Sequence, residues 1–436
     1  MAKRNDSGIT RRDFIKKVSV STAAVGVSSA FPMLITPAKA ASRDHILIGR
    51  IQPATGPMAA FSEPSPWIDE KALGELNAGG GIYIKEFGKQ VPVKIKVMDT
   101  QSDPNKAAEA ASKLILRDKV DLIYASHAPA TVNPVAQICE RFKIPCLGDN
   151  LPNEMFLAGG KYHWAFSAGP KVGEGFMAAY MDMWTQVSTN KVVGLLAGNE
   201  TDGIAFAQGS NAMLPGAGYK LIDAGRFPAG NMDFSAIISL FKKNNVEILF
   251  GNLTPPDFAR AWRQCFQMDF LPKICSIGRA IFFPSAVEAL GGDIGLGTST
   301  ECPWHPSFPF KSSMANYKSQ GLADAYETAK GKQWTEPIGF VYGGYEIIGD
   351  VLKRAKTLDK ETIRKAFAAT NMTTVMGPVK FNEQNVTTYP AGAQQWIKGK
   401  KFQYDSRLVS AGSYGHIIQP EGSLLSLQEI RGSSSR

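Results

Sequence analysis

The sequence of 436 residues predicts an α/β fold with two doubly wound, Rossmann-like lobes. Short runs of β-branched and apolar residues alternate with amphipathic helical stretches, which is the pattern of parallel sheets covered by helices on both faces. This alternation starts again after Gly169. The roughly 395 residues that follow the N-terminal segment also exceed what one hydrophobic core usually supports, so we expect two lobes.

Each block of the alternation predicts its own set of elements. The first block is expected to contain a strand at 46–51, a helix at about 67–77, a strand at 93–98, a helix at 104–117 and a strand at 121–124. The second is expected to contain a helix at about 173–188, a strand at 191–197, a helix at 203–214, a strand at 219–222, a helix at 233–244 and a strand at 247–251. In open α/β sheets ligands bind at the carboxyl ends of the strands, so the loops at those ends are the candidates for a site.

The N-terminal 40 residues have the order of a secretory signal peptide. Basic residues precede a mildly apolar run at 18–35, and the small-residue sequence Ala38-Lys39-Ala40 follows. Residues 10–17 (TRRDFIKK) resemble the twin-arginine consensus, which implies export of the folded chain by the Tat translocase. A membrane anchor is the alternative, but serine, threonine and glycine dilute the apolar run and favour a cleaved segment. We expect residues 1–40 to be removed, so that the mature protein starts at or next to Ala41.

The cysteines bear on location and on cofactors. None precedes Cys139, so we expect no lipid anchor and a protein free in the periplasm of a Gram-negative cell. An odd number of cysteines leaves at least one thiol unpaired within the chain, and we favour buried thiols over disulfides, with the pairing left open. The five are Cys139, Cys146, Cys265, Cys275 and Cys302. Metal-ligand spacing is absent from the sequence, so no metal and no cofactor are expected.

Charge and motifs argue against two other function classes. The net charge is +9, but the chain after residue 40 retains 41 basic and 37 acidic residues, a charge of +4. With no basic stripe of interleaved aromatic residues, nucleic-acid binding is not expected. The sequence has no G-x-G-x-x-G after 46–51 and no G-x-S-x-G, so we do not expect an enzyme. Gly79 to Gly81 follow a helix and not a strand, which excludes a phosphate loop.

Four segments together resemble one family over nearly the whole chain after the signal. They are 52–57 (QPATGP), 76–82 (LNAGGGI), 99–104 (DTQSDP) and 233–238 (DFSAII). Their order and spacing are similar to those of the type I periplasmic solute-binding proteins, typified by the leucine/isoleucine/valine-binding protein. The resemblance implies a Venus-flytrap, in which two lobes joined by three hinge crossovers close on a small ligand. It also implies the substrate-binding component of an ABC importer, with a membrane permease and its ATPase as partners.

Carried onto this chain, the resemblance also places the hinges. The crossovers are expected near 166–170, 300–303 and 370–378. The expected lobes are therefore 41–167 with 302–373 for lobe 1, and 168–301 with 374–436 for lobe 2.

Candidate ligand-binding residues follow from strand ends that this geometry turns towards the cleft. On lobe 1 they are Phe61, Ser126, His127, Ala128, Thr131, Asp149 and Asn150, and on lobe 2 they are Asp202, Asn252, Thr254 and Arg279, with Trp304 just past the second crossover. Phe61 stands where the family places an aromatic cover, although it could equally be a packed loop residue. Ser126 and Thr131 flank the start of a helix, where they can cap it or face an anionic ligand.

The ligand expectation rests on departures from the family. Branched-chain amino-acid binders have a glutamate that takes the ligand's ammonium, and the matching stretch here is Gly278-Arg279-Ala280. We therefore expect a small organic carboxylate bound by Arg279, with Phe61 and Trp304 as aromatic cover. An amino acid is the close alternative, if Asp202, Asp149 or Glu200 replaces the missing acid, and Arg279 then forms an ordinary salt bridge.

Two other functions stay open at the level of sequence. The same fold serves as a ligand sensor without a permease, which genomic neighbours would distinguish. An exported α/β enzyme is the weaker alternative, because Tat export is often used by cofactor proteins.

Overall fold

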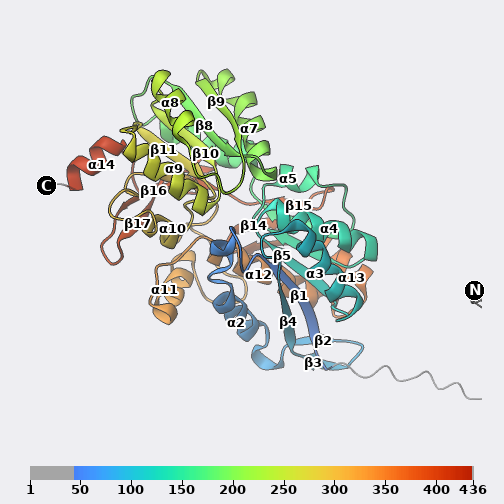
Figure 1. The fold of residues 1–436 in the computed structure, drawn as a ribbon. Helices are drawn as coiled ribbons and strands as arrows, with labels where there is room; N and C mark the ends of the chain where they lie inside the picture. Colours follow the sequence, from blue (N-terminus) through green and yellow to red (C-terminus); the bar gives the residue numbers. More distant parts are fainter. Residues whose placement is uncertain (1–43, 435–436) are drawn as a thin grey trace, which may run out of the picture. The chain divides into compact units, whose positions relative to one another are not determined.

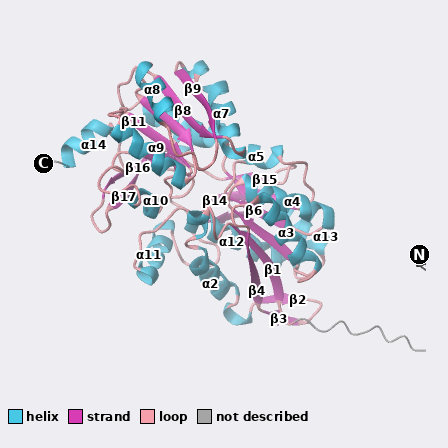
Figure 2. Ribbon diagram, viewed as in Figure 1, coloured by secondary structure: helices cyan, strands magenta, loops and turns pink. Residues whose placement is uncertain are grey.

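The computed structural model describes residues 44–434 and contains two large sheets with helices on both faces (Figures 1 and 2). The predicted signal peptide, its twin-arginine motif and its cleavage site lie outside the described residues. Within the described part of the chain, no helix is long and apolar enough to cross a membrane.

The first sheet has six strands in the order β15-β7-β6-β5-β1-β4, and every neighbouring pair is parallel. The strands are β1 (Ile46–Gln52), β4 (Val93–Asp99), β5 (Leu122–Ser126), β6 (Cys146–Asp149), β7 (Ala165–Gly169) and β15 (Val386–Thr388). Ser126 is paired in register with Asp149, so the loops after β5 and β6 leave the sheet side by side.

The second sheet has seven strands in the order β17-β16-β12-β11-β10-β8-β9. They are β8 (Val192–Gly198), β9 (Lys220–Phe227), β10 (Ile248–Asn252), β11 (Ile274–Gly278), β12 (Ser299–Cys302), β16 (Gly392–Lys398) and β17 (Tyr404–Ser410). The neighbouring strands β9, β8, β10, β11 and β12 are parallel, whereas β16 and β17 are antiparallel to their neighbours. The carboxyl ends of β8, β10 and β11 therefore lie next to one another on the same side of this sheet.

Helices cover both faces of each sheet, as alternate residues of the strands show. Leu122 and Tyr124 of β5 pack in one hydrophobic core, and Ile123 and Ala125 pack in another. The helices of the first lobe are α2 (Ser65–Leu76), α3 (Pro104–Leu116), α4 (Pro129–Phe142), α5 (Asn153–Ala158), α11 (Ser319–Lys330), α12 (Pro337–Ala355) and α13 (Lys360–Ala368). Those of the second are α6 (Ala178–Trp184), α7 (Thr201–Met213), α8 (Ser235–Lys243), α9 (Pro255–Gln267), α10 (Pro284–Glu288) and α14 (Leu427–Ser434). Two doubly wound lobes, as predicted, are confirmed.

Short elements complete the fold. The 3-10 turns are η1 (Ala59–Ser62), η2 (Ala78–Gly80), η4 (Pro215–Ala217) and η5 (Gly412–Tyr414), and η3 (Val172–Met177) is a π-helical turn that leads into α6. Two small hairpins are β2 (Ile82–Ile84) with β3 (Lys89–Val91), and β13 (Asn371–Thr374) with β14 (Gly377–Lys380).

The third crossover lies later in the chain than expected. Residues 370–378 were predicted to pass between the lobes, but the β13–β14 hairpin packs Met376 and Val379 into the core of the first lobe. Strand β15 then joins the first sheet beside β7, and the chain enters the second sheet only at β16. The predicted start of the last lobe 2 segment at residue 374 is therefore wrong, because 374–388 belongs with lobe 1.

All five cysteines are buried, and none forms a disulfide. Burial raises the pKa of the Cys139, Cys265, Cys275 and Cys302 thiols, which keeps them protonated and unreactive in the folded protein.

Candidate ligand-binding site

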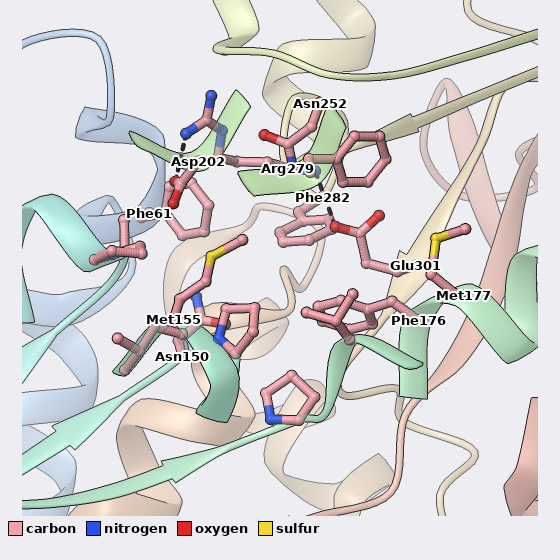
Figure 3. A pocket seen from close by; sticks show the side chains of 17 residues that line it. Phe61, Asn150, Met155, Phe176, Met177, Asp202, Asn252, Arg279, Phe282 and Glu301 are labelled. Atoms are coloured by element: carbon pink, nitrogen blue, oxygen red, sulfur yellow. Dashed lines mark hydrogen bonds and ion pairs between the residues drawn. The ribbon is translucent and has the colours of Figure 1, made fainter. Parts of the chain in front are cut away.

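Strand ends of both sheets surround one pocket, which Figure 3 shows from close by. Its empty volume, including the side that is open to solvent, is about 660 Å³. The lining residues come from both lobes and are Phe61, Ala128, Pro129, Asn150, Leu151, Pro152, Met155, Pro170, Val172, Phe176, Met177, Asp202, Phe206, Asn252, Arg279, Phe282 and Glu301. Most are apolar, so the few polar groups decide what can bind.

The lobe 1 wall is made by the loops that follow β5 and β6. The backbone of Ala128 turns into the left-handed region at φ +66°, directly before α4 begins at Pro129. Asn150 is also left-handed, at φ +51°, and its carbonyl accepts a hydrogen bond from the Ala128 N–H at 3.3 Å. The two loops are thereby tied together, and the positive end of the α4 dipole lies in the pocket wall.

Phe61 covers the pocket from the 3-10 turn η1 of lobe 1. Its ring packs edge-on against Phe283 of lobe 2, with the centroids 4.7 Å apart, and against Phe282 at 5.8 Å. Met58, Ala128 and these three rings form an apolar cluster between the lobes. The cluster joins the lobes beside the pocket without using charge.

The lobe 2 wall is centred on a buried ion triad. The Arg279 guanidinium donates to Asp202 Oδ2 at 2.5 Å and to Glu200 Oε1 at 2.6 Å. Burial would lower the pKa of Arg279, but the two carboxylates outweigh it and raise that pKa. The triad therefore carries one positive and two negative groups, and Arg279 is already neutralised.

Two oxygen acceptors in this wall lack partners. Asp202 Oδ1 and Asn252 Oδ1 are buried and receive no hydrogen bond from any described residue. Burial raises the pKa of Asp202 to about 6, with Glu200 adding to the rise and Arg279 opposing it. At pH 7 this carboxyl is mostly ionised. A buried acceptor without a donor is costly, so the site is suited to a ligand that brings N–H groups.

Glu301 of β12 also lines the pocket, close to the point where the chain returns to lobe 1. Its Oε1 accepts from the backbone N–H of Arg279 at 3.2 Å, and its Oε2 is hydrogen-bonded to Tyr180. Burial raises the pKa of Glu301 to about 8. The group is therefore mainly a neutral acid at pH 7, and it holds Arg279 in a left-handed backbone at φ +65°.

Comparison with known proteins gives the same assignment as the fold. A family model for periplasmic binding proteins matches residues 45–401. This chain belongs to that family. The leucine-, isoleucine-, valine-, threonine- and alanine-binding protein of Pseudomonas aeruginosa is 23% identical over 367 residues, covering 81% of this chain and 91% of the relative. The Leu/Ile/Val-binding protein homolog 7 of Brucella abortus is 22% identical and covers 81% and 90%.

Solved structures of similar fold hold two kinds of ligand. The branched-chain amino acid transporter substrate-binding protein of Streptococcus pneumoniae, in complex with isoleucine, has a TM-score of 0.69 at 16% identity and covers 84% of this chain and 99% of its own. A solute-binding protein of an ABC transporter from Rhodopseudomonas palustris, in complex with 3,4-dihydroxybenzoic acid, has a TM-score of 0.67 at 16% identity, with coverage of 85% and 98%. These relatives are binding proteins of transporters and not enzymes.

Six of the residues predicted for the site line the pocket of this periplasmic binding protein. They are Phe61, Ala128, Asn150, Asp202, Asn252 and Arg279. The structure brings them together from six separate segments of the chain. Whether they contact ligand stays a prediction.

Four predicted residues of lobe 1 lie behind the pocket wall. Ser126 accepts a hydrogen bond from Arg50 Nη1 at 2.5 Å, and Asp149 accepts one from Tyr124, so both belong to a buried polar network. His127 is buried behind Phe61, with ring centroids 5.4 Å apart, and Thr131 is buried in the first turn of α4. Burial raises the pKa of Asp149 to about 6, although Arg50 opposes the rise. None of the four lines the pocket.

Two more predicted residues have structural roles in this binding protein. Thr254 caps α9, where its Oγ1 donates to Asp257 Oδ2 at 2.8 Å. Trp304 is fully buried in the lobe 1 core, against Trp334 and the glycine of α12 at 339. The expectation that Trp304 covers the ligand is therefore wrong, because the chain has already turned into the core at that point.

Sequence reasoning missed most of the apolar wall. Phe176 and Met177 come from the π-helical turn, Phe206 from α7 and Met155 from α5. Helical apolar residues of this kind are indistinguishable from core residues in a sequence. Glu301 was missed as well, although an acid within an otherwise uncharged strand next to a predicted crossover was a usable signal.

Proposed function

We propose that this chain is the periplasmic substrate-binding component of an ABC importer and that its ligand is a small apolar α-amino acid, delivered to a permease with its ATPase. One observation carries the choice of ligand. Asp202 Oδ1 and Asn252 Oδ1 are buried acceptors without donors, in a pocket that is otherwise apolar. An ammonium group supplies the donors and the positive charge that this wall lacks.

The charge of the triad argues against the carboxylate expected from the sequence. Arg279 has both terminal nitrogens engaged by Asp202 and Glu200. A ligand carboxylate at Arg279 would have to displace one of these acids and leave it unpaired, which is strongly unfavourable in a buried site. The alternative that Arg279 forms a salt bridge and Asp202 receives an amine therefore fits better.

The carboxylate and the side chain of an amino acid would also meet complementary groups in the pocket. The carboxylate is placed at the lobe 1 wall, where the start of α4 and the amide of Asn150 provide positive potential and a donor. The side chain is placed among Phe176, Met177 and Phe206. The ammonium, the carboxylate and the side chain of the ligand would then each contact residues of complementary chemistry.

The test separates the amine from the carboxylate. Leucine, isoleucine and valine are compared with 4-methylpentanoate, which lacks the amine, and 3-methylbutylamine, which lacks the acid. Ligand at about 100 times its Kd stabilises the folded protein by about 2.7 kcal/mol, which a thermal shift detects. We expect a shift only with a complete amino acid. A shift with 4-methylpentanoate and none with leucine would contradict the proposal.

An aromatic acid is the second candidate, and the rings around the pocket favour it. Phe61, Phe176 and Phe282 line the site, and a protein of similar fold holds 3,4-dihydroxybenzoic acid. Such a ligand needs Asp202 protonated, so that Arg279 is released to it. Its binding would strengthen as the pH falls below about 6, the pKa of Asp202, whereas amino-acid binding would weaken. Titrations with benzoate and leucine at pH 5 and pH 7.5 distinguish the two.

A further inference from the structure

A second pocket lies between the lobes, and two of its lining residues, Glu63 and Pro284, are close in sequence to Phe61 and Phe283 of the aromatic cluster. Its empty volume, including the side open to solvent, is about 650 Å³. The lining residues are Glu63, Tyr326, Gly331, Lys332, Gln333 and Thr335 of lobe 1, with Pro284, Ser285, Glu288 and Phe402 of lobe 2. None of them lines the first pocket.

Polar contacts hold the two sides of this pocket together. Ser285 of lobe 2 donates to Glu63 Oε2 of lobe 1 at 3.2 Å. Within lobe 1, Lys332 donates to Glu63 Oε1 at 2.8 Å. Beside them, Lys401 of lobe 2 donates to Glu327 of α11 at 2.7 Å. The pocket is therefore formed only when the lobes are closed on this side.

Two buried acceptors in its wall lack donors. Gln333 is 8% exposed and Thr335 is 6% exposed, and no described residue makes a hydrogen bond with Gln333 Oε1 or Thr335 Oγ1. Both residues line the pocket. The two atoms are themselves covered, so a molecule that brings donors reaches them when the Gln333 and Thr335 side chains turn towards the pocket.

The charge and the rings narrow the class of that molecule. Glu63 and Glu288 face a single cation, Lys332, which is already paired with Glu63, so Glu288 leaves the lining with a net negative charge. Tyr326 adds an aromatic ring, which attracts cations, whereas the ring of Phe402 already receives the Lys401 ammonium, 4.9 Å from its centroid. We propose that this second pocket binds a small organic ammonium, with Glu288 as counter-ion and Gln333 and Thr335 as hydrogen-bond partners.

Binding there is coupled to closure of the lobes. A ligand that touches both lobes has more contacts in the closed state than in the open one, and it shifts the equilibrium by that difference. The same closure buries the first pocket. The second pocket is therefore an accessory site whose occupation raises affinity at the first, and the coupling must be reciprocal.

The direct test uses ethanolamine as the probe and ethylene glycol as its uncharged counterpart. Binding to the whole mature protein is measured by calorimetry and by thermal shift, with no other ligand present. We expect ethanolamine to bind and ethylene glycol to give no shift at the same concentration. Equal behaviour of the two probes would overturn the proposal, because it would remove the role of charge.

Two variants locate the site. Glu288→Gln keeps the shape of an exposed side chain and removes the counter-ion, so ethanolamine affinity should fall about tenfold or more. Gln333→Met keeps the volume and removes the amide, and it should also weaken binding. The matched control is Glu109→Gln, which should have no effect. Glu109 is an exposed glutamate of α3 and does not line the second pocket. Unchanged affinity in both test variants would place the amine elsewhere and refute the assignment.

The coupling is tested separately with whichever amino acid or acid binds the first pocket. Saturating ethanolamine should lower the Kd of that ligand, and the ligand should lower the Kd of ethanolamine by the same factor. Because ethanolamine binding is measured alone, this site can fail while the proposed transport ligand stands, and the reverse also holds. Ethanolamine that competes with the first ligand would show binding in the first pocket and refute the second site.

Discussion

The role of Arg279 in the structure differs from the role that the sequence predicts for it. In the sequence it replaces a family acid and suggests a counter-ion for a carboxylate. In the structure Asp202 and Glu200 neutralise it, and Glu301 holds its backbone N–H. The residue type was readable from the sequence, but its partners lie 77 and 79 residues away, and their approach depends on the fold. With Arg279 paired in this way, the unpartnered oxygen of Asp202 is the group that decides which ligand can bind.

Asp202→Asn tests that consequence directly. The variant keeps the size of the side chain and removes its charge, so an amino-acid ligand should bind more weakly by about 1.5–3 kcal/mol. Calorimetry measures the change. The matched control is Asp223→Asn, which removes another aspartate paired with an arginine of the same lobe, outside the pocket. Equal losses in the two variants, or none in Asp202→Asn, would contradict the role given to Asp202.

Phe61 and Trp304 provide a second contrast between single residues. Phe61→Leu removes the ring that packs against Phe283 and should weaken ligand binding several-fold, since such aromatic pairs contribute about 0.5–1.5 kcal/mol. Trp304→Phe leaves a cavity in the lobe 1 core and should lower the melting temperature while the Kd stays unchanged. Calorimetry and thermal melting on both variants separate the effects. A changed Kd in the Trp304→Phe variant would show that Trp304 does contribute to ligand binding.

At the scale of elements, most strands and helices followed from the sequence. The parallel strands are apolar runs between helices that begin with clear signals, such as Asp103 and Pro104 at α3. The third crossover was misplaced because β13, β14 and β15 have only three or four residues each, too few for a periodic pattern. The pocket's apolar wall could not be predicted for a related reason, since Phe206 and Met155 have the same helical spacing as core residues.

Strand β12 carries a group that should make stability depend on pH. The pKa of Glu301 is raised from 4.5 to about 8 by burial, so the folded protein binds its proton more tightly than the unfolded chain does. Its stabilising contribution is complete below about pH 4.5 and is lost as the pH rises through about 8. Glu301→Gln mimics the neutral acid at every pH. We expect its free energy of unfolding, relative to the unmodified protein, to increase from pH 5 to pH 8.5.

Urea unfolding at the two pH values measures this difference. The control is Glu361→Gln on α13, where Arg364 lowers the pKa of an exposed carboxyl. Its effect should not grow with pH over the same interval. A difference for Glu301→Gln that is constant with pH would show that the carboxyl is ionised when buried.

At the scale of the whole molecule, residues of both lobes line the first pocket, which is the condition for a ligand to drive closure. Small-angle scattering of the mature protein should therefore show a smaller radius of gyration when the pocket is saturated. The Glu361→Gln variant, which is changed on α13 and not in the pocket lining, should respond in the same way. An unchanged radius at saturation would contradict hinge closure.

Export is the remaining property of the whole chain that the sequence predicts. We expect the Tat translocase to recognise the pair Arg11 and Arg12, so replacing both by lysine should keep the precursor in the cytoplasm. Fractionation of cells with an antibody to the protein measures the distribution. Replacing Lys16 and Lys17 by arginine retains the charge and the twin arginine, and it should leave export unaffected. Normal export of the double lysine variant would refute the Tat assignment.

The buried cysteines give each lobe its own chemical reporter. Cys139 and Cys146 belong to a core of the first lobe, and Cys265 and Cys275 to a core of the second. A thiol reagent reaches such groups only when the surrounding structure opens, so the modification rate at each pair measures the free energy of local opening. Mass spectrometry of partly labelled protein can therefore follow the dynamics of the two lobes independently, in the natural sequence and without any engineered probe.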